Sequence, residues 1–371
     1  MAKHVYIHVP FCARRCSYCD FAIAVRRDVP VARYLVALRA EIATRFGFAK
    51  QGTVDTIYFG GGTPSHLGAE GVSDAVALVA SVFSPTRDAE ITIEANPEDV
   101  TVDAARVWRQ AGVNRVSLGA QTFNEPALEW MHRGHGAEGI LRAVDALRQG
   151  GITNISLDLI FALPDRLARN WQYDLERVLA LAPDHVSLYG LTIEPMTPLG
   201  RWVARGRELA PGEEPYEAEY MLAHDMLVER GFDHYEVSNY GRPGRWSRHN
   251  AAYWAHVPYV GLGPSAHGYD GNVRRWNLRH FQEWSDVALG GRDPIEGSET
   301  LTSANRVAED VYLGLRSTVG LHITDADRPA VEPWMAAGWI TVDAMRTARC
   351  TPSGWLRLDA IAAALTNHRS R

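Results

Sequence analysis

The sequence predicts an α/β protein, a partial (β/α)6 TIM-like barrel followed by a small C-terminal winged-helix-like α+β domain. Three observations support this fold class. A short β-rich run, a turn and a helical stretch repeat in this order from His4 onward. The predicted strands alternate apolar with polar residues. The repeated strand–helix pattern ends after about residue 195. A chain of 371 residues is long enough for one large domain and a smaller one.

The barrel is predicted from six β-rich runs, each followed by a helical pattern. The strands are expected at residues 5–9, 54–59, 90–95, 114–119, 154–160 and 185–189. In the first helical stretch, Val31, Leu35, Leu38, Ile42 and Phe46 recur at helical spacing. Since each strand is followed by a helix and a short connection, the strands are expected to run parallel.

One face of the later strands is polar. Ile91 and Ile93 alternate with Thr92 and Glu94, and the same alternation places Asp158 on the polar side of its strand. A closed eight-stranded barrel fills its centre with bulky aliphatic side chains, so a polar lumen predicts an incomplete barrel that holds a ligand. The alternative is a flat doubly wound sheet, whose strands would read as continuous apolar runs.

The change in the order of predicted strands and helices divides the chain into three predicted parts. Residues 1–195 form the partial barrel, 196–298 an accessory segment flanking it, and 299–371 the winged-helix-like domain. The accessory segment contains a helix around residues 216–230, the strand-like run FDHYEVS and a Gly-, Trp- and Arg-rich stretch. In the last part, a helix at VAEDVYLGLR precedes the strands GLHI and GWITV, a turn at TPSG and the strand-to-helix run WLRLDAIAAAL.

Composition excludes several classes of protein. The net charge of −6 does not favour nucleic-acid binding. Apolar stretches are interrupted before the roughly 18 residues that cross a bilayer, and the N-terminus MAKHVYIHVPFC lacks the apolar core of a signal peptide. We therefore expect no stable membrane insertion and a cytoplasmic location. Because the cytoplasm keeps thiols reduced, the four cysteines are not expected to form a disulfide framework.

Three of these cysteines lie in one loop, directly after the first predicted strand. Cys12, Cys16 and Cys19 can offer three thiolates to one metal centre and leave a fourth coordination position open. Zinc held by these thiolates with Asp20 or His8 is the alternative. Cys350 lies alone in the sequence and is expected to be a small buried residue.

The second predicted strand ends in FGGGTPS, residues 59–65. Bare backbone at Gly61 and Gly62 allows a ligand to approach closely, and Thr63 adds a hydroxyl group. A glycine triplet alone is usually a turn. Its position at the carboxyl end of a strand, beside the cysteine loop, makes it a candidate for ligand binding.

The spacing C-x3-C-x2-C after the first strand, with the aromatic Tyr18 before the last cysteine, resembles the radical S-adenosylmethionine (SAM) enzymes. That resemblance implies a [4Fe–4S] cluster on Cys12, Cys16 and Cys19. It also implies that the open iron takes the amino and carboxylate groups of SAM, whose sulfonium is cleaved to a 5′-deoxyadenosyl radical. The glycine loop is similar to the one that binds the methionine amino group in that family.

Further segments narrow the resemblance. YIHVPFCARRCSYCDF, IYFGGGTPS, ITIEANPE, VSLGAQTF, LDLIFALP, HNAAYW and YVGLGPSAHG are together similar to the HemW-type heme chaperones, relatives of the oxygen-independent coproporphyrinogen III oxidase. The resemblance to the oxidase implies SAM contacts at Tyr6, Gly61, Gly62, Thr63, Glu94, Gln121, Arg133 and Asp158. Carboxylates can accept hydrogen bonds from the methionine ammonium or ribose hydroxyls, and an arginine can offset a carboxylate charge.

Two departures favour the chaperones over the oxidase. The oxidase carries a further cysteine two residues after the third one, where this chain has Phe21, and its long N-terminal arm is expected to be missing here. The segment HNAAYW, residues 249–254, resembles the H-N-x-x-Y-W motif that is implicated in heme handling. The resemblance therefore implies a protein that binds heme and passes it to an acceptor hemoprotein.

His249 is the candidate heme ligand, because imidazole is the commonest protein ligand of heme iron and Tyr253 and Trp254 offer flat apolar surface. His267 is the leading rival. Three functions stay open at this point. The chain is a heme chaperone, a radical SAM enzyme such as the oxidase or a methyltransferase, or a zinc-dependent structural protein, so whether it is an enzyme is undecided.

Overall fold

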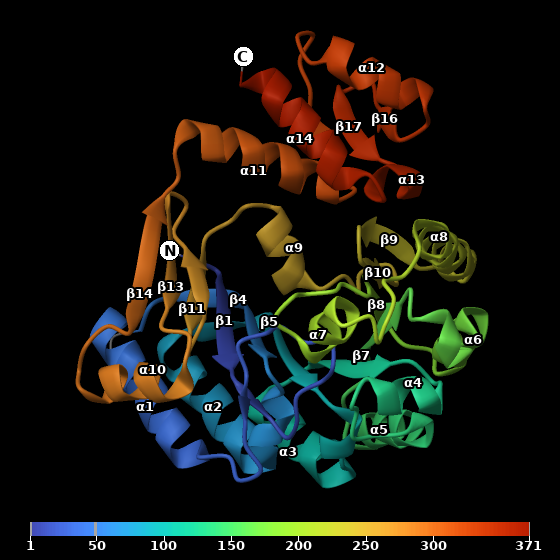
Figure 1. Cartoon of the computed structure of the whole chain (residues 1–371). Helices are drawn as coiled ribbons and strands as arrows, with labels where there is room; N and C mark the ends of the chain where they lie inside the picture. Colours follow the sequence, from blue (N-terminus) through green and yellow to red (C-terminus); the bar gives the residue numbers. More distant parts are fainter. Residues whose placement is uncertain (1, 48–49, 371) are drawn as a thin grey trace.

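The computed structural model describes residues 2–47 and 50–370, and its core is a row of six adjacent parallel strands (Figure 1). They are β1 (His4–Val9), β4 (Thr53–Gly61), β5 (Ser84–Ala95), β6 (Arg115–Gln121), β7 (Asn154–Phe161) and β8 (His185–Gly190). Every predicted strand is present, and the predicted partial barrel is confirmed. Two short strands, β2 (Phe11–Cys12) and β3 (Ala24–Val25), pair within the loop that follows β1.

Helices follow the barrel strands and cover their outer face. They are α1 (Val31–Phe46), α2 (Gly68–Val82), α3 (Val102–Ala111), α4 (Glu125–Trp130), α5 (Ala137–Gln149) and α6 (Trp171–Ala180), with 3₁₀ turns at Pro64–Leu67, Pro97–Asp99 and Asp165–Leu167. Local sequence sets their ends. The Thr101 hydroxyl accepts the Ala104 N–H at 3.1 Å at the start of α3, and Gly112 ends that helix in the left-handed conformation.

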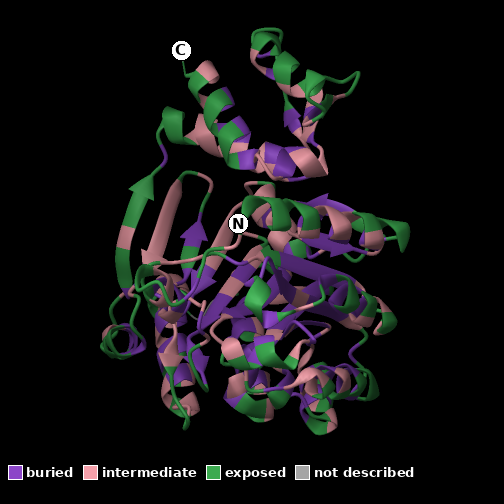
Figure 2. Ribbon diagram, turned by 45° about the vertical axis from the view of Figure 1, so that its right-hand side comes forward, coloured by how far each residue is buried: buried purple, intermediate pink, exposed green. Residues whose placement is uncertain are grey.

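The predicted alternation of the strands is present. Ile93, Leu118 and Leu157 are fully buried and belong to the core between sheet and helices. Figure 2 shows the strands largely buried and the outward faces of the helices exposed. The opposite face of the strands carries the polar side chains, including Thr92, Ser117 and Ser156. A polar lumen of this kind is consistent with a barrel that stays open at one side.

The accessory segment does more than flank the barrel, because it extends the sheet at both edges. Twelve strands follow the order β14-β13-β12-β11-β1-β4-β5-β6-β7-β8-β10-β9. The added strands are β9 (Asp233–Glu236), β10 (Asn239–Gly241), β11 (Tyr259–Leu262), β12 (His267–Tyr269), β13 (Val273–Asn277) and β14 (Ile295–Thr300). The segment's helices are α7 (Pro198–Ala204), α8 (Glu213–Glu229), α9 (Arg248–Trp254) and α10 (Phe281–Leu289). β11 runs parallel to β1, with His4 opposite Tyr259.

A buried carboxylate joins this extension to the barrel. Glu41 on α1 is fully buried and accepts hydrogen bonds from Arg45 Nη1 at 2.7 Å and the Gly263 N–H at 2.9 Å. It also accepts from Asn277 Nδ2 at 2.7 Å and from Trp284 Nε1 at 3.0 Å. One side chain therefore holds α1 to α10, to β13 and to the loop after β11.

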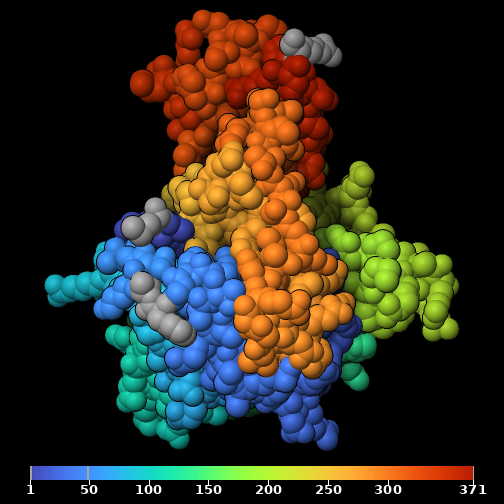
Figure 3. Space-filling model, turned by 90° about the vertical axis from the view of Figure 1, so that its left-hand side faces the viewer, coloured from blue at the N-terminus to red at the C-terminus, as the bar shows by residue number. Residues whose placement is uncertain are grey.

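The C-terminal region is a three-stranded antiparallel sheet packed between helices. Its elements are α11 (Ser303–Arg316), β15 (Leu321–His322), α12 (Arg328–Ala336), β16 (Ile340–Val342), β17 (Thr347–Cys350), α13 (Pro352–Trp355) and α14 (Leu358–Arg369). The expected boundary between residues 298 and 299 falls within β14. Figure 3 shows β14 and α11, in orange, rising from the barrel to this region.

Two local predictions in this region were wrong. The run WLRLDAIAAAL does not begin as a strand, because Trp355 ends α13 and Leu358 begins α14. The turn predicted at TPSG is also absent. The hairpin turn between β16 and β17 lies at residues 343–346, where the Arg346 N–H bonds to the Asp343 carbonyl, and not at TPSG. TPSG instead begins a helix, because the Thr351 hydroxyl caps α13 by accepting the Gly354 N–H at 3.1 Å.

Cys350 is buried on β17, as predicted. Within the described ranges, no helix has both the length and the hydropathy needed to cross a membrane.

We expect Glu41→Ala to lower the free energy of unfolding by about 3–5 kcal/mol, because it leaves the buried Arg45 guanidinium uncompensated. Chemical denaturation followed by circular dichroism measures the change. Arg39→Ala is the matched control, since Arg39 lies exposed on the same helix and its loss should change stability by less than about 0.5 kcal/mol. Equal stability of the two variants would contradict the role given to Glu41.

Candidate functional site

A pocket of about 450 Å³ lies at the carboxyl ends of the barrel strands and gathers most of the residues predicted from the sequence. We call it the three-cysteine pocket. Ten predicted residues line it: Cys12, Cys16, Cys19, Gly61, Gly62, Thr63, Glu94, Gln121, Arg133 and Asp158. The carboxyl ends of parallel strands are where ligands bind in α/β folds. Tyr6 and His249 are not in this pocket.

The cysteine loop lies along one side of the pocket. Thr63 Oγ1 donates to Cys12 Sγ at 3.4 Å, and Arg133 Nη1 donates to Cys16 Sγ at 3.5 Å. Burial raises the pKa of the Cys12 thiol to about 12 and that of the Cys19 thiol to about 11. These two thiols are therefore neutral until a metal centre displaces their protons.

The donor set of this loop fits an iron–sulfur cluster better than zinc. Over residues 2–47 and 50–370, no three Cys, His, Asp or Glu side chains stand together ready to hold a single metal ion. Of the two side chains considered as a fourth zinc ligand, Asp20 lines the pocket but His8 lines a different cavity. Three thiols spaced around one pocket suit a cluster, which is larger than one ion and takes thiolate ligands.

The glycine loop packs directly against the start of the cysteine loop. A Cβ at Gly62 would lie 2.7 Å from the Pro10 carbonyl carbon, so the missing side chain allows the cysteine loop to pack here. Gly61 has φ of 111°, and a Cβ there would lie 2.5 Å from the His8 ring. The space left by both glycines is therefore filled by protein. The sequence predicted that these glycines leave room for a ligand, whereas in the structure they leave room for neighbouring protein atoms.

Two carboxylates face the pocket from the lumen side, as predicted. Glu94 accepts from Tyr58 Oη at 2.8 Å and from the Gly61 N–H at 3.1 Å. Burial raises the pKa of Glu94 to about 7, although the hydrogen bond from Tyr58 opposes that shift. Asp158 accepts from Ser117 Oγ at 2.9 Å, and burial raises the pKa of its carboxyl as well. The Glu94 carboxyl can therefore change its charge near neutral pH.

Arg133 supplies the positive charge of the pocket. Its Nη2 donates to Asn96 Oδ1 at 2.6 Å and to the Gly119 carbonyl at 2.9 Å, which holds the guanidinium between the strand ends and Cys16. Its Nε is buried and has no hydrogen-bond partner among the described residues. A donor left in this state can bond to a ligand in the pocket. Gln121 lies beside it in a left-handed conformation, with φ of 66°.

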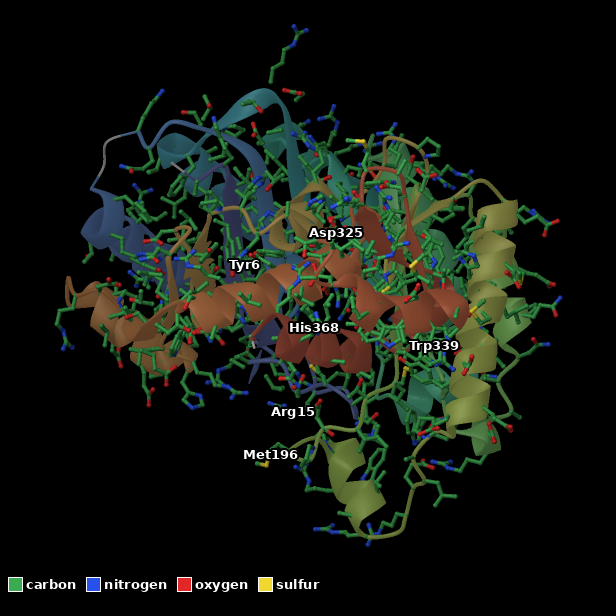
Figure 4. All side chains as sticks on the ribbon, turned by 90° about the horizontal axis from the view of Figure 1, so that it is seen from above. Tyr6, Arg15, Met196, Asp325, Trp339 and His368 are labelled. Atoms are coloured by element: carbon green, nitrogen blue, oxygen red, sulfur yellow. The ribbon has the colours of Figure 1, made fainter. Side chains whose placement is uncertain are left out.

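A second cavity of about 920 Å³ lies between the barrel edge and the C-terminal region. We call it the ring-lined cavity. Its rings belong to Tyr6, His8, Tyr253, Trp254, His256, Tyr259, His267, Tyr269 and Tyr312, and side chains of α11 and α14 complete it. Figure 4 looks onto the barrel from the C-terminal side, labels Tyr6 and shows α11 and α14 crossing above the strands. Tyr6 thus belongs to this cavity, and its Oη bonds to His8 Nδ1 at 3.1 Å.

His249 lies behind the wall of the ring-lined cavity. It is 1% exposed, and burial lowers its pKa to about 3, so the imidazole is neutral. Its Nδ1 bonds to Thr56 Oγ1 at 2.7 Å and its Nε2 to Tyr253 Oη at 2.9 Å. His267, by contrast, is exposed and lines the cavity. The arginine at this cavity is Arg274.

Sequence reasoning missed the ring-lined cavity, since its walls come from segments far apart in the chain. Tyr6 lies near the N-terminus, His256 and His267 in the accessory segment, and the remaining lining includes Thr366 near the C-terminus. The available signal was the clustering of aromatic residues and histidines in HNAAYW and YVGLGPSAHG. That signal identified the segments but not the space that they enclose.

The fold and the three-cysteine pocket define a radical SAM protein. The model of the Radical SAM superfamily matches residues 6–176. Membership of this superfamily implies a [4Fe–4S] cluster and SAM. Within it, the chain is 37% identical to the protein named heme chaperone HemW of Mycobacterium tuberculosis over 363 residues, which are 96% of this chain and 93% of that protein. The chain belongs to the HemW family.

Other relatives agree with this placement. The protein named heme chaperone HemW of Bacillus subtilis is 34% identical, covering 86% of this chain and 84% of its own length. The Escherichia coli protein of the same name is 33% identical, covering 91% of each chain. The solved structure of coproporphyrinogen III oxidase (HemN) from Escherichia coli superposes with a TM-score of 0.82 at 24% identity, covering 99% of this chain and 91% of that one. That likeness shows the shared fold.

We expect Tyr58→Phe to raise the pKa of Glu94 further above about 7, because the variant loses the donor that favours the ionised carboxylate. A hydrogen bond to a charged group contributes about 1.5–3 kcal/mol, which corresponds to about one to two pKa units. Carboxyl-carbon NMR titration measures the change. Tyr6→Phe is the control, since Tyr6 bonds to His8. Titration of Glu94 near its ordinary value in the wild-type protein would contradict this account.

Proposed function

We propose that this chain is a heme chaperone, which binds heme in the ring-lined cavity and passes it to an acceptor hemoprotein. In this proposal a [4Fe–4S] cluster and SAM occupy the three-cysteine pocket. The observation that carries the proposal is the ring-lined cavity itself. It is of the size that holds a large organic ligand, and it is bordered by Tyr253 and Trp254 of the segment HNAAYW.

In the three-cysteine pocket, Cys12, Cys16 and Cys19 would hold the cluster. Glu94 and Asp158 would accept hydrogen bonds from the amino group or ribose hydroxyls of SAM, and Arg133 would offset its carboxylate charge. Gly61, Gly62, Thr63 and Gln121 would complete the contacts with SAM. Because the cluster needs reduced thiols, the proposal places the protein in a reducing compartment such as the cytoplasm.

In the ring-lined cavity, aromatic side chains would pack against the porphyrin. Tyr253, Tyr259 and Tyr269 supply flat apolar surface. Arg274 is paired with Glu299 at 3.0 Å and with Glu309 at 2.8 Å, so a heme propionate would replace one of these carboxylates as its partner. His267 is an accessible imidazole on the cavity wall. His249 would contribute to heme binding from behind Tyr253, to which it is hydrogen-bonded.

A decarboxylating oxidase is the competing function. Phe21, which stands where the oxidase carries a further cysteine, lines the three-cysteine pocket and is 62% exposed. A phenyl ring can neither donate a proton nor ligate a metal, so the chemistry of that cysteine is absent from this position. This difference supports heme transport over conversion of coproporphyrinogen.

Replacing any one of Cys12, Cys16 or Cys19 by alanine should abolish stable cluster binding, because only two thiolates then remain in the loop. Iron and acid-labile sulfide after anaerobic reconstitution are the measurements. Cys350→Ala is the control and should retain both, since Cys350 is buried in the C-terminal region. An equal loss in the control and in Cys16→Ala would overturn the three-cysteine assignment.

The purified protein should bind about one heme per chain, seen as a shifted Soret band, and should not convert coproporphyrinogen III to protoporphyrinogen IX. The assay is run anaerobically with reductant and SAM, on protein whose iron and sulfide content shows an intact cluster. Formation of protoporphyrinogen would establish the oxidase function instead. Absence of any heme binding would refute the chaperone proposal.

A further inference from the structure

Helix α9 carries a histidine and a tyrosine that act as one hydrogen-bonded unit. His249 and Tyr253 are four residues apart and therefore lie on the same face of the helix. Tyr253 Oη lies 2.9 Å from His249 Nε2. Tyr253 lines the ring-lined cavity, whereas the buried His249 does not. The phenol therefore stands between the imidazole and any occupant of the cavity.

The other nitrogen of His249 continues the hydrogen-bonded chain toward solvent. His249 Nδ1 lies 2.7 Å from Thr56 Oγ1, and the same hydroxyl lies 2.9 Å from His4 Nδ1. His4 is only partly buried. The His249 N–H of the backbone donates to Glu90 Oε1 at 3.1 Å, which fixes the start of the helix. Tyr253, His249, Thr56 and His4 thus form a continuous proton path from the cavity to the protein surface.

We infer that Tyr253 is the axial ligand of ferric heme in the ring-lined cavity, and that His249 is a positioning residue that accepts its phenolic proton. This inference rests on the proposed function. Tyrosinate is an established ligand of heme iron, and an anionic oxygen suits the ferric state. The geometry explains how a buried histidine can affect heme binding without touching the iron.

The binding step balances without any electron transfer. The Tyr253 O–H bond breaks as the iron–oxygen bond forms, because a bound metal ion displaces the proton of its ligand. The proton passes to His249 Nε2, while Nδ1 gives its own proton to Thr56 Oγ1, and the Thr56 proton passes on to His4 and solvent. Iron stays ferric throughout, and one proton leaves for each heme bound.

His267 is the competing ligand. It lies on β12, lines the same cavity and stacks against Trp276 with ring centroids 6.0 Å apart. His256 also lines the cavity, and its Nε2 lies 2.9 Å from Glu309 Oε2. Tyr253 differs from both in having a proton acceptor, His249 Nε2. Tyr6 has a similar acceptor in His8 Nδ1, but His8 Nε2 bonds to the Ala22 carbonyl, which cannot pass a proton on, whereas His249 Nδ1 bonds to the Thr56 hydroxyl.

The test compares two probes, ferric heme and metal-free protoporphyrin IX, on the full chain. Wild-type protein with ferric heme should show a phenolate-to-iron charge-transfer band in the visible spectrum. Tyr253→Phe should lose this band and bind ferric heme at least about tenfold more weakly, yet bind metal-free protoporphyrin as the wild type does. His249→Gln should keep the band at a shifted position and lose about 10–100-fold in heme affinity, as expected for a residue that orients a metal ligand.

Tyr173→Phe is the matched control, because Tyr173 is exposed on α6, outside the ring-lined cavity, and its change should leave the binding of both probes unaffected. Retention of the band and of heme affinity in Tyr253→Phe, or their loss in His267→Ala alone, would overturn the inference while the proposed function stands. If neither probe bound the wild-type protein, the proposed function and the inference would both fall. Thermal unfolding of each variant verifies that it is folded.

Discussion

The buried carboxylate of Glu41 is the interaction on which the larger cavity depends. It joins α1 to groups 222, 236 and 243 residues further along the chain, at Gly263, Asn277 and Trp284. These groups hold β11 to β13 against the barrel, and the same strands carry Tyr259, His267 and Arg274 into the ring-lined cavity. The charge is compensated by Arg45 and by neutral donors, so the carboxylate is stable where water is excluded.

Tyr58 links the residues around the two cavities. On one side Glu94 accepts from Tyr58, and on the other the Tyr58 ring stacks on His249 with centroids 5.1 Å apart, behind Tyr253. Gly61 serves both sides, because its N–H bonds to Glu94 while its missing side chain leaves room for the His8 ring. The ligand environments proposed for SAM and heme are therefore parts of one packed structure.

Local patterns were sufficient to predict the barrel, the cysteine and glycine loops and the two lumen carboxylates, whereas Gln121 and Arg133 were assigned only from the resemblance to the oxidase. The strands of the barrel alternate regularly, and loops at their carboxyl ends must lie together, so Cys12, Glu94 and Asp158 were placed without any long-range information. The strands β11 and β12 were missed because they are four and three residues long and contain glycine and histidine. Tyr6 was assigned from family likeness to the SAM site, whereas its position in the ring-lined cavity depends on packing.

The parallel pairing of β1 with β11 has a consequence for synthesis of the chain on the ribosome. One edge of β1 pairs with β4. Its other edge has no partner until residues 259–262 of β11 have been synthesised. Until then the first strand presents unpaired backbone groups, and such edges favour association with other chains. The nascent protein therefore passes through a long stage at which its N-terminal half needs protection, before the last strands close the sheet.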